Sequence, residues 1–138
     1  MSLQADLLGL VPDERRVSVG ESVLAGHARD LTYHPAHTPD AVVFARSTQE
    51  VASVLAYANG AGVPVVAFGA GTSLEGHTIP VRGGIVLDLS RMAEVLAVRA
   101  EDLQVDVQPG VVYAALNRAL RPHGLFFPPA PGLSLIHI

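Results

Sequence analysis

The stretch from Pro64 to Pro80 reads Pro-Val-Val-Ala-Phe-Gly-Ala-Gly-Thr-Ser-Leu-Glu-Gly-His-Thr-Ile-Pro. It opens with an apolar run typical of a buried strand and then breaks into a glycine-rich loop from Gly69 to Ser73. Glycines let the backbone adopt conformations that a side chain would block, and they leave consecutive N–H groups uncovered. Such a row of amides, beside two hydroxyls, suits a phosphate or pyrophosphate. We therefore expect this loop to hold the diphosphate of a dinucleotide; an ordinary glycine-rich β-turn is the alternative.

Two well-known phosphate motifs do not fit this loop. A nicotinamide-type Rossmann fingerprint needs Gly-x-Gly-x-x-Gly running straight into a helix. Here Leu74 stands where the third glycine belongs, and residues 75–84 contain a proline and three glycines that oppose a helix. A Walker-type loop would need Gly-Lys-Ser/Thr, which does not follow. The anion would therefore have to be held by loop amides alone.

The segments around this loop alternate strand and helix patterns. Residues 41–45 form a short apolar run between turns, and residues 63–68 form a second one. Between them, Ser47 and Glu50 have the spacing of a capping box, followed by apolar residues at helical spacing and by glycines that stop the helix. We predict a right-handed strand–helix–strand unit with parallel strands, and a third strand over residues 84–90.

The remaining segments show other patterns. Residues 94–98 and 103–108 alternate apolar and polar side chains, which is typical of half-buried antiparallel strands, with Leu103 expected on the inward side. Residues 111–121 show an apolar helical face between turn signals. The stretch from 18 to 37 is polar and turn-rich, and we expect an irregular surface segment there.

The composition indicates one modest, ordered domain. The chain has 138 residues, 49% of them hydrophobic and 16% charged, with a net charge of −4. The basic residues form no stripe, so nucleic acid is not an expected partner. No cysteine is present, and no apolar run approaches the ~20 residues of a membrane span. Because the N-terminus lacks the features of a signal peptide, we expect a cytoplasmic protein, with or without peripheral contact with a membrane.

The residues that could carry metal or acid–base chemistry form no motif. His34 and His37 are three positions apart, but Pro35 between them opposes a helix and no third ligand follows nearby. We therefore predict no metal site. Helix caps and solvated strand faces explain the available carboxylates, so we assign no catalytic residue. These carboxylates are Glu50, Glu75, Asp88 and Asp106.

Several blocks of the chain resemble one group of flavoproteins. The string from Gly62 to Gly76 resembles the FAD loop of the vanillyl-alcohol-oxidase type, and more narrowly that of the D-lactate dehydrogenase (cytochrome) and glycolate oxidase group. Further blocks resemble the family in the same order, at 38–44, 83–92, 107–111 and 125–132. The resemblance covers residues 29–132 and is far more specific than a glycine loop alone. It implies FAD as the cofactor.

The resemblance also implies a fold, which is α+β, a FAD-binding domain of the PCMH type. A small parallel βαββ subdomain would span residues 41–89, and a mixed, mainly antiparallel subdomain would start near Glu94, with FAD between them. We divide the chain into a lead-in at 1–37, a truncated FAD-binding domain at 38–132 and a tail at 133–138. The cofactor contacts implied by the resemblance are Phe68, Gly69, Ala70, Gly71, Thr72, Ser73, Leu74, Gly76, His77, Pro131 and Gly132.

Two positions depart from the family pattern. His77 stands where many relatives have a small residue, and it either donates a hydrogen bond to the cofactor or is a plain loop histidine. A covalent flavin link through His77 is not expected for this group. Ala130 stands where many relatives have an acid, so no polar contact is assigned to that position.

The activity implied by the resemblance is oxidation of a D-2-hydroxy acid such as D-lactate. In the family, the flavin accepts a hydride equivalent from the α-carbon, and electrons pass to a cytochrome, a quinone or another acceptor. Substrate-binding groups lie mainly in a C-terminal domain absent from this sequence, so we expect the 138-residue chain alone to be inactive. Two alternatives stay open: a glycolate oxidase subunit or other FAD-linked oxidase of the superfamily, and a non-catalytic flavin-binding module.

The last six residues, 133–138, read Leu-Ser-Leu-Ile-His-Ile. They form an apolar tail that completes no element. These residues can be encoded as CTG TCT CTT ATA CAC ATC, which is how a widely used transposase sequencing adapter reads in this frame. We expect the tail to be non-native and the native sequence to continue beyond Gly132; a genuine terminal strand is the alternative.

Overall fold

The computed structural model describes residues 2–128, and the chain divides into two compact units, Met1–Arg91 and Met92–Ile138. The second cofactor contact that the sequence predicts, at Pro131 and Gly132, lies outside the described residues, as does the tail at 133–138.

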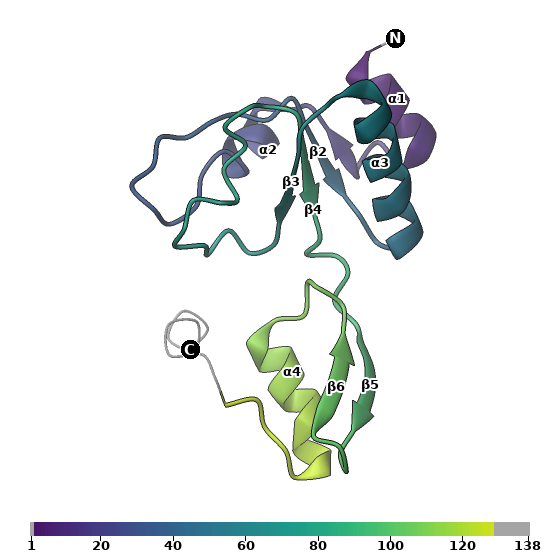
Figure 1. Cartoon of the computed structure of the whole chain (residues 1–138), viewed down its shortest axis with the longest axis vertical. Coiled ribbons are helices and arrows are strands. Elements are labelled where there is room, and N and C mark those ends of the chain that lie inside the picture. Colours follow the sequence, from purple (N-terminus) through teal and green to yellow (C-terminus); the bar gives the residue numbers. More distant parts are fainter. Residues whose placement is uncertain (1, 129–138) are drawn as a thin grey trace. The chain divides into compact units, whose positions relative to one another are not determined.

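A four-stranded sheet forms the centre of the first unit (Figure 1). Its strands are β1 (Val17–Ser18), β2 (Ala41–Phe44), β3 (Val65–Phe68) and β4 (Ile85–Asp88), in the order β1-β2-β4-β3. β4 pairs in parallel with both β2 and β3, and β1 is an antiparallel edge. The predicted parallel strands are confirmed, but β2 and β3 are not neighbours. All four residues of β4 are buried, as expected of a central strand covered on both faces.

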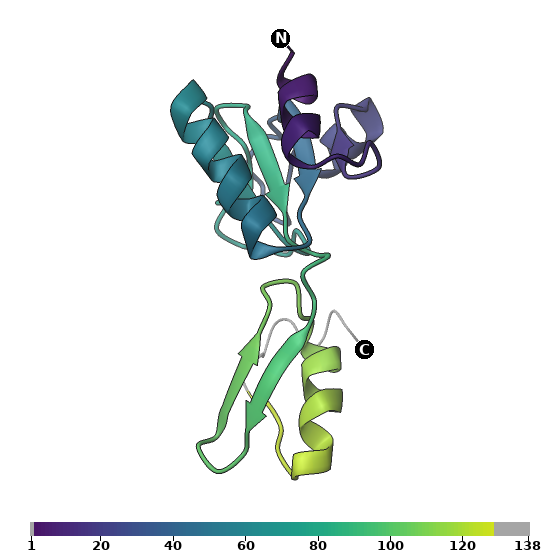
Figure 2. The same ribbon diagram turned by 90° about the vertical axis from the view of Figure 1, so that its right-hand side faces the viewer.

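Helices cover both faces of this sheet. α1 (Leu3–Leu10) and α3 (Thr48–Ala61) lie on one face and α2 (Glu21–Gly26) on the other (Figures 1 and 2). On the α2 face, the core is built from Val42, Phe68 and Val86, one from each parallel strand, with Val23 and Leu24 of α2 packed against them. α2 therefore packs against a residue from each of the three parallel strands.

The predicted capping box at the start of α3 is only half formed. The Ser47 hydroxyl accepts the Glu50 N–H at 3.2 Å, as predicted. The Glu50 carboxylate instead accepts the Arg46 N–H at 2.8 Å and the Arg16 guanidinium at 2.8 Å. Burial pushes the pKa of Glu50 upward, but the bonds from Arg46 and Arg16 outweigh it and leave the pKa lowered. Because Arg16 directly precedes β1, this ion pair joins the N-terminal edge strand to α3.

The prediction of an irregular surface segment at 18–37 is wrong in part. Ser18 pairs with Val42 of β2, and α2 packs on the sheet. Ala28 and Asp30, further along the segment, are buried. The strand and helix have two and six residues, which is too short for hydrophobic periodicity to reveal them.

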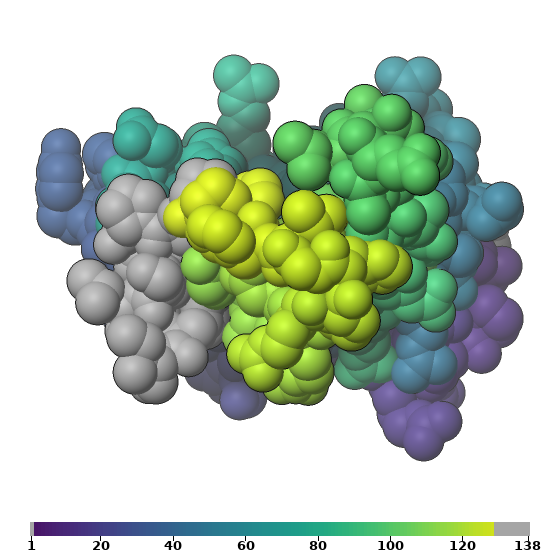
Figure 3. Space-filling view, turned by 90° about the horizontal axis from the view of Figure 1, so that it is seen from below, coloured from purple at the N-terminus to yellow at the C-terminus, as the bar shows by residue number. Residues whose placement is uncertain are grey.

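The second unit is a hairpin with a helix. β5 (Val95–Arg99) and β6 (Gln104–Val107) are antiparallel, as predicted, and α4 (Tyr113–Leu120) leads into a short 3-10 helix at Arg121–His123. The expectation for Leu103 is wrong: its φ of 54° and its 77% exposure place it in the turn. Figure 3 shows the segment after α4, coloured yellow, on the surface of this unit, where Phe126 is exposed.

Candidate functional site

The glycine loop begins where β3 ends, at the carboxyl edge of the parallel sheet. Residues 69–73 form its first half, and residues 73–78 form its second half. Gly71 and Gly76 have φ angles of 66° and 72°, in the left-handed region that favours glycine. None of the hydrogen bonds formed within residues 2–128 uses an N–H group of residues 69–73 as its donor. No helix follows the loop before β4. The loop therefore presents a row of uncommitted amide donors, the donor set that a diphosphate requires.

Phe68 supports this loop from the side of the core. A Cβ atom at Gly71 would lie 2.8 Å from Cζ of the Phe68 ring, so the backbone of Gly71 rests directly on that ring. The Phe68 side chain is only 8% exposed and packs with Val42 and Val86. The Phe68 ring therefore supports the conformation of the loop. The backbone of Phe68 leads directly into residues 69–73, whose N–H groups form the row of free donors.

The second half of the loop is fixed by its own side chains. The Ser73 hydroxyl accepts the Glu75 N–H at 3.2 Å and lies 3.0 Å from Nδ1 of His77. Leu74 and His77 are exposed beside it. The sequence suggested that the hydroxyls of Thr72 and Ser73 could bind an anion. In the structure, the Ser73 hydroxyl instead forms hydrogen bonds within the loop. The predicted site residues from Phe68 to His77 thus form one continuous loop.

Asp30 is a residue of this site that the sequence did not indicate. Its Oδ1 atom accepts the Thr32 N–H at 2.9 Å and the Thr32 hydroxyl at 2.5 Å, and its Oδ2 atom lies 3.4 Å from the Thr78 hydroxyl. The Thr32 hydroxyl is the main cause of a lowered Asp30 pKa, and it outweighs the opposing effect of burial. The N-terminal segment therefore contacts the glycine loop directly.

A second polar cluster lies at the same edge of the sheet. The strand register places Asp88 at the end of β4 between Phe44 of β2 and Phe68 of β3. Asp88 is 4% exposed, and its Oδ2 atom is 2.9 Å from Nε2 of His27. The expectation of a cap or solvated strand face for Asp88 is wrong, because its carboxylate is buried against a histidine. The guanidinium of Arg91 lies 4.6 Å from the centre of the Phe44 ring.

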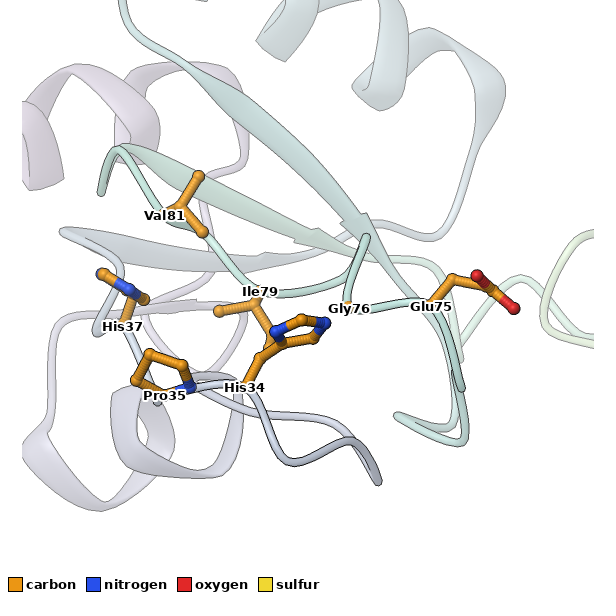
Figure 4. Close-up of a pocket in the computed structure, with 7 residues that line it drawn as sticks. All are labelled: His34, Pro35, His37, Glu75, Gly76, Ile79 and Val81. Atoms are coloured by element: carbon orange, nitrogen blue, oxygen red, sulfur yellow. The ribbon is translucent and has the colours of Figure 1, made fainter.

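A pocket of about 250 Å³ lies beside the second half of the loop (Figure 4). In this view the His34 ring lies beside Gly76 and Ile79, and the Glu75 carboxylate points away from the pocket. His37 lines its other end. Within residues 2–128, no group of three side chains is placed to hold a metal ion.

The fold and the loop together define a class of protein, a domain with a small parallel sheet and, at its carboxyl edge, a glycine-rich loop whose free amides suit a diphosphate cofactor. A family model described as an FAD binding domain matches residues 39–135, and the chain belongs to this family. FAD is therefore the cofactor of the domain, and the uncommitted amides of residues 69–73 fit its diphosphate.

Curated relatives support the same assignment. The chain is 38% identical over 135 residues to the mitochondrial D-lactate dehydrogenase [cytochrome] of Arabidopsis thaliana, and the match covers 96% of this chain and 24% of that protein. It is 40% identical over 122 residues to a probable mitochondrial D-lactate dehydrogenase of Danio rerio, with 88% and 24% covered. It is 39% identical over 105 residues to glycolate oxidase subunit GlcD of Bacillus subtilis, with 76% and 22% covered. The chain thus spans about a quarter of the length of these relatives.

Solved structures confirm the predicted α+β fold of the PCMH type. A substrate-bound p-cresol methylhydroxylase superposes with a TM-score of 0.76 at 25% identity, over 88% of this chain and 24% of that chain. The 4-ethylphenol oxidase of Gulosibacter chungangensis gives a TM-score of 0.74 at 27% identity, over 87% and 24%. An alkyldihydroxyacetonephosphate synthase gives 0.77 at 19% identity, over 89% and 26%, which concerns the fold alone. Across the described part of the chain, every helix is too short or too polar to span a bilayer.

Proposed function

We propose that this chain is part of the FAD-binding domain of a dehydrogenase that oxidises a D-2-hydroxy acid resembling D-lactate. Electrons would pass from the flavin to a cytochrome or a quinone-type acceptor. The observation that supports the proposal most is the row of uncommitted amides at residues 69–73, in a chain similar to two proteins named D-lactate dehydrogenase. The substrate and the acceptor rest on those relatives, of which the chain spans a quarter.

Each predicted residue has a distinct part in this proposal. The N–H groups of residues 69–73 would donate to the diphosphate oxygens, and the Phe68 ring would hold the loop in place. The exposed side chains of Leu74 and His77 would flank the cofactor, and Pro131 and Gly132 would supply the second contact. When bound, the flavin supplies the hydride-accepting chemistry, while the protein binds and orients it.

Glycolate is the alternative substrate, because the chain is 39% identical to glycolate oxidase subunit GlcD of Bacillus subtilis. Residues that would distinguish the two acids are expected outside this chain. We further propose a cytoplasmic location, with or without peripheral membrane contact; the names of the Arabidopsis and Danio relatives place those proteins in mitochondria.

The experiment has two parts. Titration of the 138-residue chain into FAD should quench flavin fluorescence with a saturable curve, while D-lactate with a dye acceptor should give no turnover. The protein extended to the full length of its relatives should then reduce the dye with D-lactate at a higher kcat/KM than with glycolate. A full-length protein that binds no FAD would contradict the cofactor role, and a preference for glycolate would replace the proposed substrate by the alternative.

A further inference from the structure

We propose that Asp30 is a positioning residue that fixes the second half of the glycine loop before FAD binds. The proposal rests on the proposed function, since it concerns the loop assigned to the diphosphate. It assigns a role to the N-terminal segment, which lies outside the residues that the family model matches.

The segment that carries Asp30 is itself a closed loop. The His37 N–H donates to the Ala28 carbonyl at 2.9 Å, which joins the two ends of residues 28–37. Ala28 is 4% exposed and anchors the beginning of the segment, and α2 precedes it on the sheet. Asp30 is therefore held on a short, anchored support rather than on a loose terminus.

The carboxylate of Asp30 divides its two oxygen atoms between two partners. Oδ1 is engaged within its own segment by the N–H and the hydroxyl of Thr32. Oδ2 faces the end of the glycine loop, where it accepts from the Thr78 hydroxyl at 3.4 Å. A carboxylate that is only 9% exposed needs such donors, because an unpaired buried charge is costly. Asp30 thus connects its segment to the end of the loop at Thr78.

A second contact between the same two segments supports this role. A Cβ atom at Gly76 would lie 2.7 Å from Cδ2 of His34, so the His34 ring lies directly against the backbone of Gly76 (Figure 4). With a φ of 72°, Gly76 also takes a conformation that other residues rarely adopt. The contact requires both the glycine and the position of the 28–37 segment.

The consequence for the cofactor is a division of the hydrogen-bond donors of the loop. A carboxylate beside a diphosphate would repel it unless loop donors neutralise that carboxylate. The Thr78 hydroxyl donates to Asp30, whereas no N–H group of residues 69–73 donates a hydrogen bond within the described chain. Asp30 therefore directs the second half of the loop inward and leaves the first half to the ligand. Binding to a loop ordered in advance costs less entropy.

The test uses the whole 138-residue chain and two readouts. Hydrogen exchange of amides 69–80 is measured without FAD, and FAD affinity is measured by fluorescence quenching. Asp30→Asn replaces an acceptor oxygen by an NH2 group that faces donors, so exchange at 73–78 should accelerate about tenfold and FAD affinity should fall about tenfold. Thr78→Val keeps the size of its side chain and should give a smaller acceleration. The control Asp6→Asn removes a carboxylate bonded to Tyr57 at 2.9 Å and should change neither readout.

The two readouts separate this inference from the proposed function. Unchanged exchange at 73–78 in both Asp30→Asn and Thr78→Val would overturn the role of Asp30, whether or not FAD binds. If the wild-type chain does not quench FAD, the proposed role of the loop fails, while the exchange data still decide whether Asp30 orders it. If Asp30→Asn does not fold, Thr78→Val decides.

Discussion

His27 and Asp88 lie 61 positions apart in the chain, and their Nε2 and Oδ2 atoms face each other at 2.9 Å. The other ring nitrogen of His27, Nδ1, lies 2.8 Å from the Val23 carbonyl, which can only accept. Both nitrogens therefore face acceptors, an arrangement that suits an imidazolium beside an ionised carboxylate. The hydrogen bond to Asp88 is the main cause of a raised His27 pKa, although burial opposes it.

This pair predicts a pH dependence of stability. The His27 pKa is raised above its ordinary 6.5. The contribution of protonated His27 to the free energy of unfolding is therefore fully present below pH 6.5 and is lost as pH rises through the raised value. Burial pushes the Asp88 pKa upward, but hydrogen bonds from His27 and Ser90 leave it below 3.8. The contribution of ionised Asp88 to the free energy of unfolding is present above pH 3.8 and is lost as pH falls through the lowered value. The pair should stabilise the fold most between these limits.

The variant His27→Gln tests this dependence through denaturant unfolding at several pH values. Near pH 5.5 the free energy of unfolding of His27→Gln should be about 1.5 to 3 kcal/mol below that of the wild-type chain, the range for a hydrogen bond to a charged group. This deficit should shrink at higher pH. His123→Gln is the control, because His123 lies in the exposed 3-10 helix of the second unit. A deficit that is the same from pH 5 to pH 9 would show that the charge of His27 does not contribute.

The ion pair of Arg16 and Glu50 gives a second prediction. The Arg16 side chain is 10% exposed, so Glu50→Gln leaves a nearly buried guanidinium with only Asp13 as its charged partner, at 3.3 Å. We expect a loss of about 2 kcal/mol, below the usual cost of breaking a buried pair because Glu50 is partly solvated. Asp106→Asn breaks the exposed pair with Arg99 and should leave the urea midpoint unchanged. Equal midpoint shifts in the two variants would contradict the role of burial.

The sequence could predict the parallel strands but not their order. Apolar runs identify β2, β3 and β4, because strands covered on both faces consist of such runs. Which strand lies in the centre depends on pairing between distant segments, and no local pattern records it. The glycine loop was found because its chemistry lies in consecutive residues. His27, Asp30 and Asp88 were missed because each is a single polar residue whose partner lies far along the chain.

Leu103 shows a different limit of the sequence pattern. The sequence alternates from Leu103 to Gln108, but β6 begins only at Gln104 and ends at Val107. The strand pattern does not specify where the turn ends, and the turn takes Leu103 into a left-handed conformation with φ 54°. A leucine rarely adopts this conformation, so no local pattern predicts it at this position.

A third prediction concerns the start of β4. A Cβ atom at Gly84 would lie 2.3 Å from the Pro64 carbonyl oxygen, which accepts the Ile85 N–H at 2.8 Å, and Gly84 has a φ of 78°. Gly84→Ala must therefore separate β3 from β4. We expect the free energy of unfolding to fall by about 4 kcal/mol or more, or the chain not to fold, as measured by thermal unfolding. Gly60→Ala has open space on α3 and should stabilise the chain by about 0.5 to 1 kcal/mol. A stable, native-like Gly84→Ala protein would contradict the pairing of β3 with β4.

The last prediction separates conformation from contact within the amide row. Gly71→Ala meets two obstacles, a φ of 66° and a Cβ position 2.8 Å from the Phe68 ring. The conformation alone costs about 1 to 2 kcal/mol, so FAD affinity of the chain should fall about tenfold or more. Gly69→Ala is the matched control, because nothing lies within 4 Å of its Cβ position and its φ is not positive.

Adding Phe68→Leu to Gly71→Ala should restore affinity only in part, because it removes the contact and leaves the unfavourable φ. Full recovery would show that the ring contact alone limits the site. Unchanged FAD affinity in Gly71→Ala would mean that the diphosphate does not depend on the path of this loop.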